Sequence, residues 1–205
     1  MSRLLCPKCH RPLKTCICRF ITHISNDIPV IILQHPNEVT QSKGSLTLLA
    51  NSLSQCTVII DEDFSQNEQL NQLLAHYKEQ AYLLYPHKQA IALSFDKFNN
   101  SAKNQEDKII NNNNICLILI DATWKKAYRM FMLSKNLQRL TKLQLPDGYQ
   151  SHYKIRKTSV INGLSTLEAC CYALSLLERN KKKYQPMIEN FKEFNQFLLS
   201  FQKRD

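Results

Sequence analysis

The stretch LILIDATWKKAYRMF, from Leu117 to Phe131, decides the fold that we expect for this chain. With the preceding Ile115 and Cys116 it forms an unbroken apolar run that ends at Asp121, and a pattern with helical spacing begins near Thr123. An unbroken apolar run of this length is typical of a strand that is covered on both faces of a sheet. We therefore predict a central strand over 115–121 that leads directly into a helix over 123–133.

Segments of the two kinds alternate along the rest of the chain. Apolar runs predict strands over 28–36, 57–61 and 81–86. Patterns with helical spacing predict helices over 45–53, 67–78, 165–180 and 186–202. This order favours an α/β domain with a mostly parallel sheet flanked by helices. The Asn-rich stretch 99–114 is expected to be a surface excursion within that domain.

Four cysteines cluster near the amino terminus in the segment CPKCHRPLKTCIC, which begins at Cys6 and contains Cys9, Cys16 and Cys18. A C-x-x-C pair and a C-x-C pair can offer four thiolates to one tetrahedral zinc ion, and His10 could replace one of them. A labile redox cluster is the competing interpretation. The segment is too short to bury a core, so a metal would supply its folding energy. We predict a zinc knuckle over 1–20, followed by one catalytic domain over 21–205.

Charge and composition narrow the class of partner. The chain has 205 residues and a net charge of +10, which favours a polyanionic partner. Nucleic acid is favoured over a membrane surface because no basic amphipathic helix with an aromatic stripe stands out. The first residues resemble no signal peptide, and no apolar run is long enough to span a bilayer. We therefore expect a soluble cytoplasmic protein without a membrane partner, while its oligomeric state stays open.

Asp121 is the main candidate for chemistry. Ligands of an open parallel sheet collect beyond the carboxyl ends of its strands, and Asp121 ends the predicted central strand. The alternative is structural, with Asp121 or Thr123 capping the following helix and Trp124 anchoring it in the core. Tyr128 and Phe131 share a helical face with Trp124 and are predicted to be core residues.

Several motifs resemble the DTW-domain family, in the order found there. The signature is Asp-x-Thr-Trp at Asp121 to Trp124. The other matches are the amino-terminal cysteine pairs, LQHPNE at 33–38, LLYP at 83–86, YKIRK beginning at Tyr153 and LSTLEA beginning at Leu164. Within the family, the resemblance is to bacterial tRNA-uridine aminocarboxypropyltransferases of the TapT type.

The resemblance implies a SPOUT-like α/β domain, whose carboxyl-terminal region can be knotted, that binds S-adenosylmethionine through loop backbone. This agrees with the three isolated glycines of the chain, which exclude a glycine-rich nucleotide loop. The implied reaction transfers the 3-amino-3-carboxypropyl group of S-adenosylmethionine to the ring imide nitrogen of a tRNA uridine and releases methylthioadenosine.

The resemblance also suggests roles for individual residues. Asp121 would act as the base, since partial desolvation beside Trp124 makes a carboxylate a better proton acceptor, and Thr123 and Trp124 complete the catalytic motif. The S-x-x-E spacing of Ser165 and Glu168 predicts a capping box, so their side chains are expected to be structural. Residues implied to contact S-adenosylmethionine are Leu84, Pro86, Ile120, Trp124, Leu164, Ser165 and Thr166.

Six residues are candidates for RNA contact because they are basic or aromatic and lie within or beside the motifs. They are Lys43, Lys125, Lys126, Tyr153, Arg156 and Lys157. Two other functions remain open at this point. One is a SPOUT-type RNA methyltransferase with the same donor, and the other is a zinc-dependent RNA-binding module without catalysis.

Overall fold

The protein is seen here in a computed structural model that describes residues 4–9, 11–40, 45–94, 114–149, 151 and 163–202. The strands are β1 (Val30–Gln34), β2 (Cys56–Ile60), β3 (Ala81–Leu84), β4 (Ile91–Ala92), β5 (Cys116–Asp121) and β6 (Thr141–Gln144). The α-helices are α1 (Leu46–Ser52), α2 (Glu68–Tyr77), α3 (Trp124–Leu133), α4 (Lys135–Arg139), α5 (Thr166–Leu177) and α6 (Gln185–Gln202). Short 3₁₀ turns cover Leu13–Thr15, Cys18–Phe20, Pro36–Glu38 and Lys78–Gln80.

The six strands form one sheet in the order β2-β1-β5-β3-β6-β4, and every pairing within it is parallel. The predicted α/β class and mostly parallel sheet are therefore confirmed. The apolar run 115–121 is confirmed as an interior strand, because β5 pairs with β1 on one side and β3 on the other. The short elements β4, α4 and β6 were not predicted, and the knot stays a prediction.

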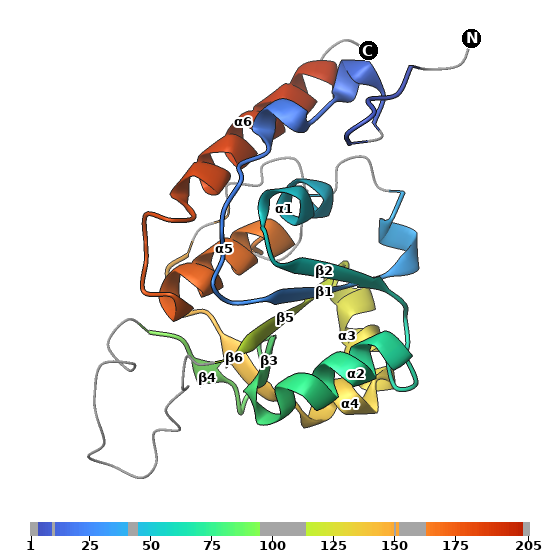
Figure 1. Ribbon diagram of the computed structural model, residues 1–205, viewed down its shortest axis with the longest axis vertical. Coiled ribbons are helices and arrows are strands. Elements are labelled where there is room, and N and C mark those ends of the chain that lie inside the picture. The colour runs from blue at the N-terminus through green and yellow to red at the C-terminus, as the bar shows by residue number, and fades with distance from the viewer. Residues whose placement is uncertain are drawn as a thin grey trace.

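Helices cover both faces of the sheet, with α1 and α5 on one side and α2, α3 and α4 on the other (Figure 1). Side chains of β5 alternate between the two resulting cores. Leu117 and Leu119 pack in the core beneath α1 and α5, whereas Cys116 and Ile118 pack against α2, α3 and α4. A strand that contributes to both cores must be apolar at every position, which explains the unbroken run in the sequence.

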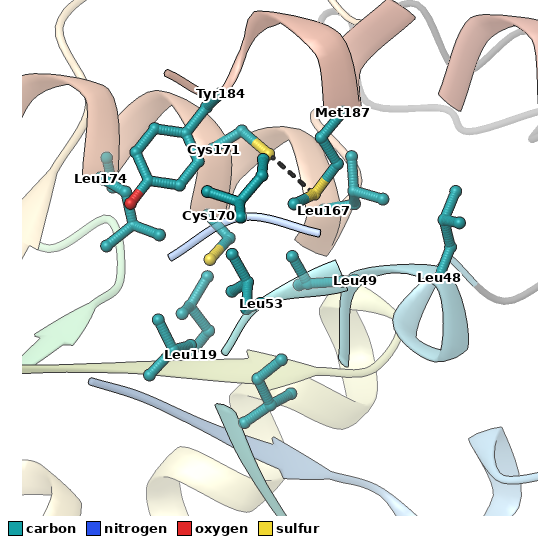
Figure 2. Packing of buried hydrophobic residues seen from close by; sticks show 14 of the residues in the cluster. Leu48, Leu49, Leu53, Leu119, Leu167, Cys170, Cys171, Leu174, Tyr184 and Met187 are labelled. Carbon is teal, nitrogen blue, oxygen red and sulfur yellow. Dashed lines mark hydrogen bonds between the residues drawn. The ribbon is translucent and has the colours of Figure 1, made fainter. Parts of the chain in front are cut away.

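The core on the α5 side is continuous from the sheet out to α6 (Figure 2). Leu119 of β5 lies below α5, and Tyr184 and Met187 lie on its other side. The Cys171 thiol is 3.4 Å from the Met187 sulfur, so the two helices meet through polarisable side chains. Helix α5 is therefore an inner layer between the sheet and α6.

The amino-terminal cysteine segment packs on α6 rather than standing apart (Figure 1). Phe20 lies 5.7 Å from Phe194 and 5.4 Å from Phe197, measured between ring centroids. The Arg19 guanidinium lies over both Phe20 and Phe197, 4.6 Å and 4.3 Å from the two ring centroids. Buried residues of this segment belong to the same core as α5 and α6. The division into a knuckle and a catalytic domain stays a prediction.

Of the helices that the structure describes, none combines the length and the apolar character that crossing a bilayer requires.

Candidate active site

Asp121 lies at the carboxyl end of β5 and is held by side chains from two other elements. The Thr166 hydroxyl, in the first turn of α5, donates to Asp121 Oδ1 at 2.6 Å. The Gln34 amide, at the end of β1, donates to Asp121 Oδ2 at 3.2 Å. The two donors bind different oxygens of one carboxylate, so its orientation is fixed about the strand end.

Asp121 lies at a topological switch point of the sheet. From β1 the chain continues to β2 on one side, whereas from β5, the neighbour of β1, it continues to β6 on the opposite side. Gln34 and Asp121 are direct partners in the β1–β5 register, and the His35 N–H donates to the Asp121 carbonyl at 3.2 Å. The crevice beyond such a point is where open parallel sheets bind ligands. Asp121 is half-buried there.

A second group of charged side chains surrounds this edge. His35 is buried; its Nδ1 accepts from the Asn37 N–H at 3.0 Å, and its Nε2 lies 3.3 Å from Glu62 Oε1. Arg129 Nε is 2.9 Å from the same Glu62 oxygen. Since His35 Nδ1 is an acceptor, Nε2 carries the proton and donates to Glu62. His35 is therefore a satisfied structural residue that connects β1 to α3 through Glu62.

The capping alternative for the Asp-x-Thr-Trp motif is not what the geometry shows. Thr123 occupies the N-cap position of α3, yet its side chain makes no capping hydrogen bond. Asp121 instead bonds to β1 and α5. The capping box predicted at the other motif is confirmed, because the Ser165 hydroxyl accepts from the Glu168 N–H at 3.2 Å and the Ser165 N–H donates to Glu168 Oε2 at 2.9 Å.

The structure corrects the expectation that Tyr128, on α3, is a core residue. Phe131 is buried as predicted, but Tyr128 is 60 % exposed and Trp124 is 46 % exposed. The buried face is centred instead on Ala127, Met130 and Phe131. Successive residues are about 100° apart around a helix, so Tyr128 is rotated away from that face. The exposed side of α3 does carry aromatic and basic residues together, contrary to the expectation that no such helix exists.

The residues implied to contact S-adenosylmethionine lie at the same edge of the sheet. Leu84 ends β3 and is half-buried, and Pro86 is exposed two residues later. Ile120 is half-buried next to Asp121, and Leu164 precedes the Ser165 cap. The Thr166 contact brings the start of α5 to the end of β5, and the binding role of these residues stays a prediction.

Two of the six proposed RNA-contacting residues fall within the described part of the chain. Lys125 is exposed, whereas Lys126 is half-buried and bound to Glu38 Oε1 at 2.8 Å. Lys126 is therefore partly committed to joining α3 to the turn after β1. Lys43, Tyr153, Arg156 and Lys157 lie outside the described residues, as do His10 and most of the stretch 99–114.

Cys6, Cys9, Cys16 and Cys18 converge into one cluster, and their sulfur atoms all lie within 4.8 Å of one another. The Cys6–Cys18 and Cys9–Cys16 sulfur distances are 3.6 Å and 3.8 Å. Four sulfurs placed tetrahedrally at about 2.3 Å from a zinc ion would be about 3.8 Å apart. The donor set and its spacing therefore fit a tetrahedral metal ion.

The thiols of this cluster differ in acidity. Backbone N–H groups of Cys9 and Lys8 lower the pKa of Cys6 to about 6. Desolvation and the neighbouring thiols raise the pKa of Cys18 to about 12. One thiolate thus forms easily, while four negative charges so close together need a cation to neutralise them.

Gln34 and the Thr166 hydroxyl were not predicted as partners of Asp121. The sequence contains a signal for Gln34, because it is the polar residue that ends the apolar run of β1, as Asp121 ends that of β5. No comparable signal marks the Thr166 hydroxyl, which reaches Asp121 only because α5 packs over the sheet.

A parallel sheet with an oriented carboxylate at its topological switch point defines an α/β protein of the kind whose ligands collect at the carboxyl edge of the sheet. A four-cysteine cluster suited to a metal adjoins this domain. The chain belongs to the DTW-domain family, since it matches the DTW domain over residues 3–199.

Curated relatives agree with this assignment. The chain is 31% identical over 205 residues to tRNA-uridine aminocarboxypropyltransferase 2 of Macaca fascicularis, covering 96% of this chain and 63% of that protein. It is 29% identical over 203 residues to the Mus musculus protein of the same name, with the same coverage. The Drosophila melanogaster protein of that name is 29% identical over 190 residues, covering 89% and 70%. The chain thus spans 63% of the length of the macaque and mouse relatives. No solved structure matches it.

Proposed function

We propose that this protein is a tRNA-uridine aminocarboxypropyltransferase that uses S-adenosylmethionine as donor. The observation that carries the proposal is the carboxylate of Asp121, oriented by Thr166 and Gln34 at the carboxyl edge of the sheet. The names of the curated relatives supply the reaction class, and the DTW domain covers nearly the whole chain.

In the proposed reaction, the imide nitrogen of a uridine attacks the γ carbon of the methionyl group. A nitrogen–carbon bond forms while the carbon–sulfur bond breaks, and the electron pair stays on sulfur to give neutral methylthioadenosine. The imide proton passes to Asp121, whose help as a general base is worth roughly a hundredfold to ten-thousandfold. Orientation of the γ carbon, rather than the methyl carbon, toward the nitrogen supplies the remainder.

Other residues of the edge would hold the donor and the acceptor. Trp124 follows Asp121 by three positions and is only half covered, so its ring can face the sulfonium, an attraction worth about 1 kcal/mol. Leu84, Pro86 and Ile120 would provide apolar contact for the adenine. The backbone of Leu164 to Thr166 would border the methionyl group, and Thr123 would complete the motif beside Asp121.

The cysteine cluster is proposed to hold a structural zinc ion through Cys6, Cys9, Cys16 and Cys18. The distances between the four sulfurs support this assignment. Four thiolates leave no open coordination position, so the ion would stabilise the segment and take no part in the transfer.

A tRNA is the proposed acceptor, consistent with the net charge of +10. Lys43, Lys125, Lys126, Tyr153, Arg156 and Lys157 are proposed to contact it, and a cytoplasmic location is part of the same proposal. Binding through phosphates would weaken steeply as salt concentration rises.

The test is to incubate the purified protein with tRNA from cells that lack the modification and with S-adenosylmethionine labelled in its methionyl chain. Nucleoside mass spectrometry should find a uridine that carries the aminocarboxypropyl group, and methylthioadenosine should accumulate. A methylated nucleoside with S-adenosylhomocysteine would instead identify a methyltransferase. Binding of tRNA without either product would identify a non-catalytic RNA-binding module.

A further inference from the structure

Helix α3 carries an exposed stripe formed by Trp124, Tyr128 and Met132. The three side chains are 46 %, 60 % and 50 % exposed, and they recur every four residues along one side of the helix. Residues at this spacing are neighbours on a helix surface, so the stripe is continuous and about 12 Å long. The opposite side of α3 is buried against the sheet, which leaves the stripe free of any role in the core.

The stripe begins beside the candidate active site. Trp124 is the first residue of α3, and only Ala122 and Thr123 separate it from Asp121. A ligand bound along the stripe would therefore extend toward the Asp121 carboxylate.

A row of positive charge runs beside the aromatic residues. Lys125 and Arg129 are both exposed and one turn apart, three residues from Tyr128 and Met132 respectively. Arg129 is bound to Glu62, and Lys125 has no ion-pair partner among the residues that the structure describes. Aromatic faces next to free positive charge match the chemistry of single-stranded nucleic acid, whose bases stack on rings while its phosphates meet cations.

We propose that the stripe is the binding track for an unpaired tRNA segment that contains the target uridine. A base flanking that uridine stacks on Tyr128, Met132 adds apolar contact beside it, and Lys125 contacts a phosphate of the same segment. Double-stranded RNA presents no base faces, so the stripe selects loops. This inference rests on the proposed function, because it takes tRNA to be the acceptor.

The experiment measures the Kd of a single-stranded oligouridylate of about eight nucleotides, within the range that one binding track covers. Quenching of the fluorescence of Trp124, the sole tryptophan of the chain, reports binding. Tyr128→Ala should raise the Kd roughly tenfold, and Tyr128→Phe should restore it because the ring face returns. Tyr128→Leu should remain weak, which separates stacking from simple hydrophobic contact. Lys125→Gln should lower the slope of log Kd against log salt by about 0.7.

Leu133→Ala is the matched control, since Leu133 is a 40 % exposed apolar residue of the same helix outside the stripe. Leu133→Ala should bind the oligouridylate with the wild-type Kd. Tyr128→Ala should bind duplex RNA with the wild-type Kd. The inference is overturned if Tyr128→Ala binds oligouridylate and tRNA normally. It is also overturned if Tyr128→Ala instead converts a dimer to a monomer in sedimentation, or abolishes binding to anionic lipid vesicles.

These outcomes are separable from the fate of the proposed function. A wild-type protein that binds oligouridylate through Tyr128 but transfers nothing to tRNA supports the track and refutes the transferase. If the wild type transfers normally and Tyr128→Ala is equally active and binds oligouridylate with the same Kd, the binding track is refuted and the transferase is not.

Discussion

Replacing Thr166 by Val removes the hydroxyl that holds Asp121 and keeps the shape of the side chain. The lost hydrogen bond, at 2.6 Å and to a carboxylate, belongs to the class worth about 1.5–3 kcal/mol. Because both partners are only half-buried, the expected loss of unfolding free energy is about 1–2 kcal/mol. For a chain of this size, that lowers Tm by about 2–8 °C.

The effect on catalysis should exceed the effect on stability. If Thr166 positions Asp121, the carboxylate of Thr166→Val can rotate, and kcat for aminocarboxypropyl transfer should fall about 10- to 100-fold. The KM for tRNA should be unchanged, because Thr166 contacts the proposed general base Asp121 and not the RNA. Thr166→Ser, which keeps the hydroxyl, should recover most of kcat. The assay is initial-rate transfer of label to tRNA, with Tm measured on the same samples.

A double-mutant cycle shows whether Thr166 acts through Asp121. In an Asp121→Asn background, Thr166→Val should cause little further loss of the residual rate, since the group that it positions is already gone. Independent, multiplicative losses would refute the reasoning. So would a Thr166→Val protein with a lowered Tm and a normal kcat, because the hydrogen bond would then be structural only.

Three further predictions concern separate parts of the molecule. Asp121→Ala should reduce transfer at least about a hundredfold while tRNA binding stays near wild type, and an active variant would eliminate the proposed base. Its Tm should fall at least as far as that of Thr166→Val, because the hydrogen bonds from Thr166 and Gln34 are both lost. Cys16→Ser should lose the bound metal, measured by elemental analysis, whereas Cys56→Ser, outside the cluster, should retain it; equal metal content in both would refute the four-thiolate site. Asn195→Leu should raise Tm by about 2–4 °C, because neither polar atom of this buried amide has a hydrogen-bond partner in the part of the chain that the structure describes. Asn190→Leu, on the same helix, should instead lower Tm, because it removes a 2.8 Å hydrogen bond to the Thr22 hydroxyl.

The long elements could be predicted because their patterns come from burial. β5 is apolar from Cys116 to Ile120 since each face meets a helical layer, and α5 is marked by its Ser165–Glu168 capping box. β4 and β6 could not be predicted, because they are two and four residues long and their residues are mostly half-buried. Their strand conformation depends on neighbours in the sheet, which local sequence does not encode.

The candidate site was predictable at Asp121 and at the cysteines, where residue type and position along a strand or turn carry the information. The partners of Asp121 depend on tertiary packing, which brings residues 34, 121 and 166 together. The prediction that Tyr128 is a core residue was wrong for a related reason. Spacing along a helix groups residues into faces, but only the neighbouring sheet decides which of two adjacent apolar faces is covered, and here it covers Ala127, Met130 and Phe131.

Contacts between the cysteine segment and α6 couple the folding of two parts of the chain that are far apart in the sequence. Arg19 contacts the rings of both Phe20 and Phe197, and Arg11 lies 5.7 Å from the Phe194 ring. The packing of α6 and the ordering of the cysteine segment therefore depend on the same contacts. A cation held by the sulfurs would therefore also tighten α6, and chelating it would loosen that helix. By reciprocity, damage to the last helix would weaken the grip on the ion. Loss of such a cation would then loosen both ends of the chain together.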